Sequence, residues 1–242
     1  KNSNQSILDK KEALKQIKAG NFSLADADEK LKADKEIVLE AIKQDSLRSS
    51  LYDVDDKLKG DKEFVLEVVK QDGWNLRHVD DKLKADKEVV LAAVKENPHA
   101  LQHADKKLKG DKEVVLTAIK QNGSALSYAN DKLKADKEVV LAAVKQDGLS
   151  MTRVRKTLSC ANDKLKANKE IVLAAVKQDG SNLQYADKKL MGDKEVVLEA
   201  VKQNGRALRY ADKKLMGDKD VVLAAVKQDA SVFEFADNKL KE

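Results

Sequence analysis

The chain has 242 residues, of which 37% are charged and 4% are aromatic, and its 47 basic and 42 acidic residues leave a net charge of +5. The two signs are interspersed, which excludes a basic or an acidic tail, and the apolar runs are far shorter than the roughly 20 residues of a membrane span, so we expect none. The single cysteine, Cys160, excludes an internal disulfide framework.

A motif led by a leucine recurs along almost the whole chain and predicts a repeat array. Successive copies are 25 residues apart, except for one spacing of 27 residues and one of 32 residues. A fixed period in the range of about 20–50 residues is typical of solenoids and related arrays. The leading leucines are Leu31, Leu58, Leu83, Leu108, Leu133, Leu165, Leu190, Leu215 and Leu240.

Residues 1–30 are a degenerate first repeat. Asp9 is expected to cap a helix that Gly20 closes, and Leu24 then follows the apolar pattern of the later repeats. The end of an array faces water, so an atypical and more polar repeat is expected at this position.

Residues 31–132 contain regular repeats, each of which predicts two helices. In the copy that starts at Leu108, Asp111 is a good N-cap for a first helix over residues 112–121. The equivalent residue is Asn168 in one copy, so we attribute this column to capping rather than to charge. The predicted apolar stripe consists of Val115, Leu116 and Ile119.

The second helix of the same copy is predicted over residues 124–134. The Asn122–Gly123 pair is expected to end the first helix, because glycine adopts the left-handed conformation without a Cβ penalty. Three small or apolar residues then follow at helical spacing and are expected to face inward. These residues are Leu126, Ala129 and Leu133.

Residues 133–164 form a repeat with seven extra residues, after which regular repeats occupy residues 165–242. The insertion covers residues 148–158, and its apolar residues keep helical spacing. Because seven residues are close to two helical turns, we predict a longer second helix, with a loop as the alternative. The insertion also contributes two basic residues, Arg153 and Arg155.

The repeats predict an all-α fold, namely an α-solenoid of stacked two-helix hairpin repeats. One hairpin of this size cannot bury its apolar stripes alone, whereas stacked copies cover one another. We therefore expect a single array over residues 1–242 and an elongated monomer.

Three columns of the predicted second helix vary freely, while the core and capping columns hardly change. They lie nine, six and five residues before each leading leucine and share one helix face. We call these columns the variable stripe and predict that it binds a protein, because tryptophan, tyrosine and arginine are enriched at binding hot spots. The alternatives are that these exposed positions drift without function, and that the tyrosines are half-buried spacers. The candidate residues are Trp74, Arg77, His78, His99, Gln102, His103, Tyr128, Tyr185, Arg206, Arg209, Tyr210 and Phe235, together with Arg153 and Arg155 of the insertion.

Enzymatic chemistry is not indicated by any motif in the chain. His99 and His103 have the spacing of a zinc pair, but no nearby acidic residue completes a zinc-hydrolase motif, and His78 lies one repeat away. Cys160 has no histidine partner in register, and there is no phosphate loop or nucleophile elbow. We expect no catalytic residues, no metal and no cofactor.

Two further functions remain open beside protein binding. The lysines could bind a nucleic-acid backbone, but the column of Lys109 becomes Met191 and Met216, so a continuous phosphate track is not maintained. Alternatively, the array is a rigid spacer or targeting segment for a catalytic domain elsewhere. The chain opens at Lys1 without a methionine, and we interpret it as part of a longer protein.

The DKEVVLAAVK core and the following [DN]-G-x-x-L-x-Y-A pattern resemble a family of short helical repeats catalogued as a domain of unknown function. This resemblance covers the chain from about Leu8, apart from the opening repeat and the insertion. The family is common in large proteins of amoeba-infecting intracellular bacteria, including secreted effectors of Legionella-like organisms. The resemblance implies an effector that a bacterium delivers into the host cytoplasm and that binds a host protein. It supplies no catalytic residues.

Overall fold

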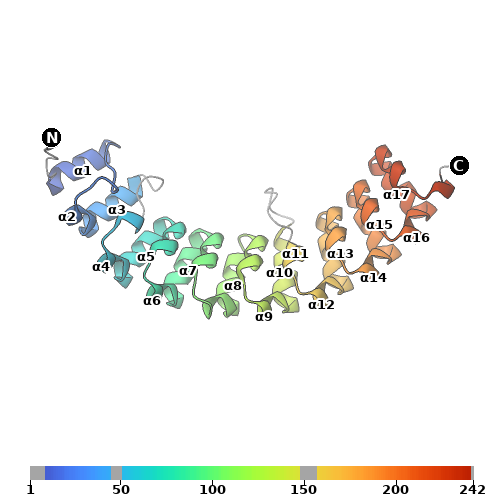
Figure 1. Cartoon of the computed structure of the whole chain (residues 1–242), viewed down its shortest axis with the longest axis horizontal. Coiled ribbons are helices and arrows are strands. Elements are labelled where there is room, and N and C mark those ends of the chain that lie inside the picture. The colour runs from blue at the N-terminus through green and yellow to red at the C-terminus, as the bar shows by residue number, and fades with distance from the viewer. Residues whose placement is uncertain (1–8, 45–50, 148–156, 241–242) are drawn as a thin grey trace, which may run out of the picture. The chain divides into compact units, whose positions relative to one another are not determined.

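The computed structural model describes residues 9–44, 51–147 and 157–240. The chain divides into two compact units, residues 1–118 and residues 119–242, which we call the N-terminal half and the C-terminal half. Both halves are built from short helices, shown in chain order in Figure 1, and the described residues contain no β-strand. The predicted all-α repeat fold is confirmed.

Each repeat combines a longer α-helix, a 3₁₀ helix and a single α-helical turn. The α-helices are α1 (Lys10–Lys18), α2 (Glu29–Lys32), α3 (Lys35–Gln44), α4 (Asp56–Lys59), α5 (Lys62–Gln71), α6 (Asp81–Lys84), α7 (Lys87–Glu96), α8 (Lys112–Ile119), α9 (Asp131–Lys134), α10 (Lys137–Asp147), α11 (Thr157–Cys160), α12 (Asp163–Lys166), α13 (Lys169–Gln178), α14 (Lys188–Met191), α15 (Lys194–Gln203), α16 (Lys213–Met216) and α17 (Lys219–Gln228). The 3₁₀ helices are η1 (Leu51–Asp53), η2 (Gly73–His78), η3 (Pro98–His103), η4 (Leu108–Gly110), η5 (Gly123–Tyr128), η6 (Gly180–Tyr185), η7 (Gly205–Tyr210), η8 (Ala230–Phe235) and η9 (Asn238–Leu240). In the described ranges, no helix combines the length and the apolar composition that crossing a membrane requires.

Equivalent elements of neighbouring repeats pack side by side within each half. In the N-terminal half α5 packs against α7, and η2 packs against η3. In the C-terminal half α13 packs against α15 and α15 against α17, while η6, η7 and η8 form a parallel series. Stacking of this kind lets repeats too small to hold a core cover one another.

The predicted continuous second helix is wrong, because the chain leaves the helical conformation in its middle. Ala129 lies between η5 and α9 with φ −66° and ψ 159°, which is extended backbone. The next residue, Asn130, accepts the amide of Leu133 through its side chain and so starts a new helical turn. Asparagine and aspartate favour such caps over helix interiors.

The interruption frees a backbone amide that ties one repeat to the one before it. The amide of Asp80 donates to the carbonyl of Lys59 at 3.2 Å, and the amide of Asp187 donates to the carbonyl of Lys166 at 2.9 Å. Asp212 makes the same bond to Met191 at 2.9 Å. Because the acceptor is a main-chain carbonyl, this column accepts lysine or methionine without loss of the bond.

The core confirms one predicted stripe and corrects the other. Leu126, Ala129 and Leu133 are 0%, 4% and 5% exposed, so they face inward as predicted. On the first helix, Leu116 is half-exposed, and the wholly buried residues belong to a four-residue set. That set is Val114, Val115, Ala118 and Ile119.

The glycine after each α-helix is required by close packing, and the predicted left-handed conformation is wrong. Gly20 is the only residue with positive φ among those described, at 72°. A Cβ atom on Gly180 would lie 2.0 Å from the carbonyl oxygen of Ala200 in the next repeat. On Gly205 it would lie 2.5 Å from that of Ala225. The aspartate or asparagine before the glycine caps the 3₁₀ helix, as Asp179 does by accepting the amide of Ser181 at 2.8 Å.

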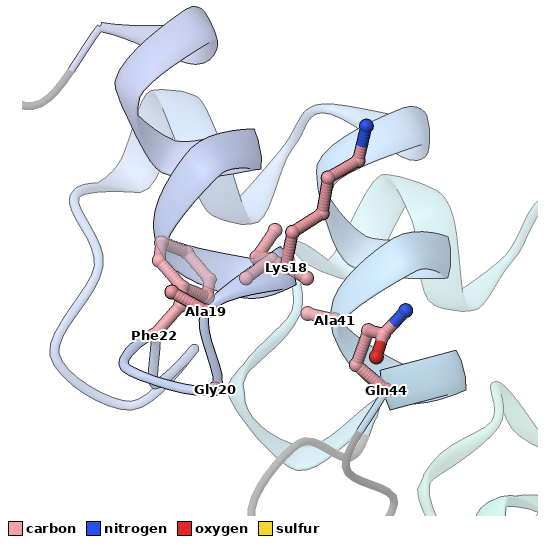
Figure 2. A pocket seen from close by; sticks show the side chains of 7 residues that line it. Lys18, Ala19, Gly20, Phe22, Ala41 and Gln44 are labelled. Carbon is pink, nitrogen blue, oxygen red and sulfur yellow. The ribbon is translucent and has the colours of Figure 1, made fainter.

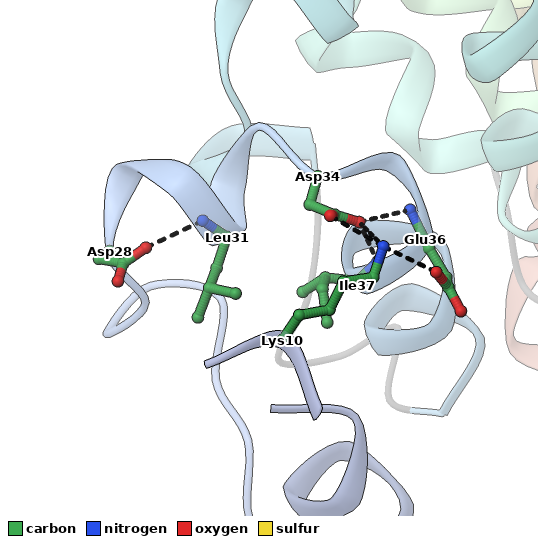
Figure 3. A network of polar contacts seen from close by, with 6 residues as sticks. All are labelled: Lys10, Asp28, Leu31, Asp34, Glu36 and Ile37. Atoms are coloured by element: carbon green, nitrogen blue, oxygen red, sulfur yellow. Dashed lines mark hydrogen bonds and ion pairs between the residues drawn. The ribbon is translucent and has the colours of Figure 1, made fainter. Parts of the chain in front are cut away.

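The aspartate column at the start of each α-helix has two roles rather than one. Figure 3 shows the first example, in which Asp34 accepts the amides of Glu36 and Ile37 at 3.1 and 3.2 Å. Lys10 of the preceding repeat lies 2.9 Å from the Asp34 carboxylate and 2.7 Å from that of Glu36. The attribution of this column to capping alone is therefore incomplete, because the charge also links repeats.

The same lysine-to-aspartate link recurs in both halves. Lys87 lies 2.8 Å from Asp111, and Lys169 lies 2.7 Å from Asp193. Each hydrogen bond from the lysine holds the pKa of its aspartate below the ordinary value. Where Asn168 replaces the aspartate, it still caps Ile171, and the preceding lysine bonds to a glutamate of the same first turn instead.

Asp193→Asn is expected to lower the melting temperature slightly at neutral pH, because asparagine keeps the cap and loses the ion pair with Lys169. Asp193→Ala should lower stability further, by about 1 kcal/mol, because it also removes the cap. The pKa of Asp193 is lower in the folded chain than its ordinary value of 3.8. The charged carboxylate therefore stabilises the fold above that pH, and the contribution is lost as the pH falls below it.

Thermal unfolding followed by circular dichroism between about pH 7 and pH 2.5 checks this. The difference between wild type and Asp193→Asn should vanish at the acidic end. A difference of the same size at both ends would contradict a role for the charge.

Candidate protein-interaction surface

The variable stripe lies on the 3₁₀ helices. With about three residues per turn, residues three apart lie directly above one another, which aligns Trp74 with Arg77 on η2 and Arg206 with Arg209 on η7. The first residue of each pair is held by the cap of its helix. The carboxylate of Asp72 accepts the amide of Trp74 at 2.9 Å.

Aromatic rings of successive repeats meet along the stripe of the N-terminal half. The indole of Trp74 stacks on the imidazole of His99 of the next repeat, with ring centroids 6.4 Å apart and planes 10° apart. It also contacts His103, with centroids 5.9 Å apart. One repeat earlier, Tyr52 meets His78 edge-on at 5.4 Å. Trp74 is 39% exposed and Tyr52 is 70% exposed, so a partner can reach both rings.

His78 and His103 are half-buried among positive charges. Their Nε2 atoms are shielded from solvent and have no hydrogen-bond partner among the described residues. Burial lowers the pKa of both imidazoles, and the nearby Arg77 guanidinium lowers them further. Both rings are therefore neutral at pH 7.

The stripe of the C-terminal half is centred on Arg209. Its guanidinium lies 5.5 Å from the ring centroid of Tyr210 and 5.8 Å from that of Phe235 in the next repeat. Cation–π contacts of this geometry are typical of arginine beside aromatic rings. Arg206 instead donates to the carboxylate of Asp229 at 2.9 Å, so part of its charge is used between repeats.

The remaining candidates are less exposed than predicted or lie outside the described residues. Gln102, Tyr128 and Tyr185 are half-buried, which agrees with the spacer interpretation for these two tyrosines. Arg153 and Arg155 lie outside the described residues, as does the predicted helix through most of the insertion.

Two groups of surface residues that the candidate set omits belong to the same surface. Tyr52 occupies the column of Arg77 and Arg209, so its position in the repeat could have identified it. The cations near the histidines, Lys59, Lys84 and Lys109, are far from the stripe in the sequence. Only the packing of each short α-helical turn beside the next 3₁₀ helix shows their proximity.

The pockets of the described residues do not form a recognisable active site. A pocket of about 280 Å³ lies at the first repeat, where Gly20 and Phe22 face Ala41 and Gln44 of α3 (Figure 2). Its one charged lining residue is Lys18, which offers no acid–base pair. No group of three or more histidine, cysteine or acidic side chains in the described ranges is arranged to hold a metal.

The family model described as a domain of unknown function, DUF4116, matches the chain over residues 11–59, 61–109, 111–158, 155–191 and 193–241. The chain belongs to the DUF4116 family. The predicted resemblance to a helical repeat family of unknown function is thereby confirmed. Most of these DUF4116 matches span two of the 25-residue repeats, beginning near the cap of a longer α-helix. Comparisons with curated proteins and with solved structures give no match.

Proposed function

We propose that this DUF4116 chain is a non-enzymatic scaffold that binds a protein through its variable stripe. The observation that carries the proposal is the contact between exposed rings of successive repeats, centred on Trp74 and His99. These contacts turn separate variable positions into one continuous surface in the N-terminal half.

The division of labour within each repeat supports this proposal. Caps, inter-repeat ion pairs and the buried leucines hold the fold with nearly constant residues. The stripe is free to vary because its side chains are not needed for those tasks. Tryptophan, tyrosine and arginine at such positions are the residue types that dominate binding energy at protein interfaces.

The absence of an enzymatic role is part of the proposal. An active site needs a few groups with different environments, such as two carboxylates whose pKa values diverge. Here the shifted carboxylates, among them Asp111, Asp193 and Asp218, share one direction and one cause, a lysine of the preceding repeat. A repeated environment of this kind serves stability.

The proposal places the scaffold, as a monomer, in the cytoplasm of a host cell as part of a bacterial effector. This part rests on the resemblance to effector repeats alone. A translocation reporter fused to the full-length protein should give a host-cell signal that depends on the bacterial secretion system, and a signal confined to the bacteria would refute it.

The stripe is tested with a variant that carries Trp74→Ala, Arg77→Ala, Arg206→Ala and Arg209→Ala. A partner is first captured from eukaryotic lysate by the tagged chain, identified by mass spectrometry and purified. The variant should bind it at least about tenfold more weakly, because hot-spot truncations each cost about 2 kcal/mol or more.

A matched control removes the same three positive charges from exposed positions outside the stripe, through Lys11→Ala, Lys30→Ala and Lys132→Ala. Both variants should keep the helical signal and the melting temperature of the parent. If the folded stripe variant binds the purified partner as well as the control does, the stripe is not the binding surface.

A further inference from the structure

We infer that the surface around Arg77, His78 and His103 binds an acidic, extended segment of the partner protein. The inference rests on the proposed function and specifies the chemistry that the stripe of the N-terminal half recognises.

The first support is an arginine without a carboxylate. Arg77 is exposed and forms no ion pair with any residue that the structure describes. The lysines that begin the α-helices of this half behave differently, since Lys62 and Lys87 each bond to carboxylates of the next repeat. A free guanidinium offers a planar set of donors that matches a carboxylate in bidentate geometry.

The second support is the sign of the charges that act on the two histidines. His78 on η2 is influenced by Arg77 of the same helix, by Lys59 of α4, by Lys84 of α6 and by His103. Every one of these charges disfavours protonation, and no carboxylate opposes them.

His103 on η3 has a similar environment. It is influenced by Arg77, by Lys84 and by Lys109 of η4, again without an opposing carboxylate. Lys84 is bonded to Asp81, whose side chain is 96% exposed, whereas Lys109 has no such partner in the described ranges. The local field is therefore positive, and a negatively charged ligand is favoured there.

The third support is the ring platform beside these charges. Trp74 and Tyr52 expose ring surface on either side of Arg77 in the sequence of repeats, and Trp74 is fixed by its contacts with His99 and His103. An extended peptide presents side chains at regular intervals, so its carboxylates could reach Arg77 while its apolar groups lie on the rings.

A nucleic-acid backbone fits this surface less well. Phosphates recur at regular intervals and are best met by a cation in each repeat. The column of Arg77 instead has Tyr52 in the preceding repeat and Gln102 in the following one, both uncharged. An isolated arginine between neutral neighbours suits one or two carboxylates of a protein segment.

Binding of an acidic segment should be coupled to protons. A carboxylate placed beside neutral His78 and His103 favours their charged forms, so the complex takes up protons as it forms. The affinity should therefore rise by about threefold or more between about pH 7.5 and pH 5.5, where histidine titrates and glutamate does not.

The experiment uses the whole chain and a fluorescein-labelled peptide of alternating glutamate and alanine, followed by fluorescence anisotropy at low salt. The peptide in which glutamine replaces glutamate should not bind. Arg77→Gln should weaken binding of the acidic peptide at least about fivefold, and the charge-matched Lys11→Gln should leave it unchanged. His78→Gln combined with His103→Gln should remove the pH dependence, with the fold of each variant checked by its melting temperature.

Three results would overturn the inference. One is equal weakening by Arg77→Gln and Lys11→Gln, which indicates attraction to net charge alone. Another is an affinity that does not change with pH. The third is tighter binding of a labelled oligouridylate than of the acidic peptide. If the lysate partner still depends on the stripe in any of these cases, the proposed scaffold function stands and only its acidic specificity fails.

Discussion

Gly180→Ala is expected to destabilise the C-terminal half by about 1–3 kcal/mol or more, because the new methyl group meets backbone that cannot move aside. The Cβ atom would lie 2.0 Å from the carbonyl oxygen and 2.9 Å from the carbonyl carbon of Ala200, and 3.1 Å from the amide nitrogen of Asn204. Relief requires α15 to move away from η6. That movement would weaken the packing of α15 on both η6 and α13.

Gly192→Ala is the matched control for this substitution. Its Cβ atom would lie 3.6 Å from the nearest atom, the carbonyl oxygen of Lys189, which is an ordinary contact. Other repeats have alanine in this column, as Ala85 and Ala167 do. The control should be neutral or stabilising by about 0.4–1 kcal/mol, because alanine reduces the entropy of the unfolded chain. Urea unfolding midpoints compare the two, and equal midpoints would show that the repeats do not pack this closely.

Leu183→Ala is expected to lower the free energy of unfolding by about 2–5 kcal/mol, the range for truncating a fully buried leucine. Leu183 is 0% exposed on η6, in a column where Leu76, Leu101, Leu126 and Leu208 are equally buried. The loss combines the transfer of the side chain out of water with the cavity that is left behind.

Leu223→Ala removes the same atoms from a side chain that is 59% exposed on α17. It should cost less than about 1 kcal/mol, since little of the lost surface was hidden from water. Urea unfolding followed by circular dichroism measures both variants. Similar losses for the two leucines would contradict the assignment of the buried column to the core.

The binding surface was predictable as a set of positions but not as a set of contacts. Counting back from each leading leucine identifies Trp74, Arg77 and His103 as variable. That Trp74 reaches His99 and His103 of the next repeat depends on the distance between stacked repeats, which no local pattern contains. The positive field around the histidines likewise depends on lysines that are distant in the sequence.

The sequence by itself determined the all-α class, the repeat period, the capping residues and the inward-facing column of Leu126, Ala129 and Leu133. These follow from local rules, because spacing and capping act within one or two helical turns. Only the tertiary structure decided that the second helix is interrupted at Ala129, that the glycine column is set by the approach of the next repeat, and that each capping aspartate also holds a lysine of the preceding repeat. The physical reason is that these three features arise from the contact between repeats, where a neighbouring backbone or charge competes with what each segment would do alone.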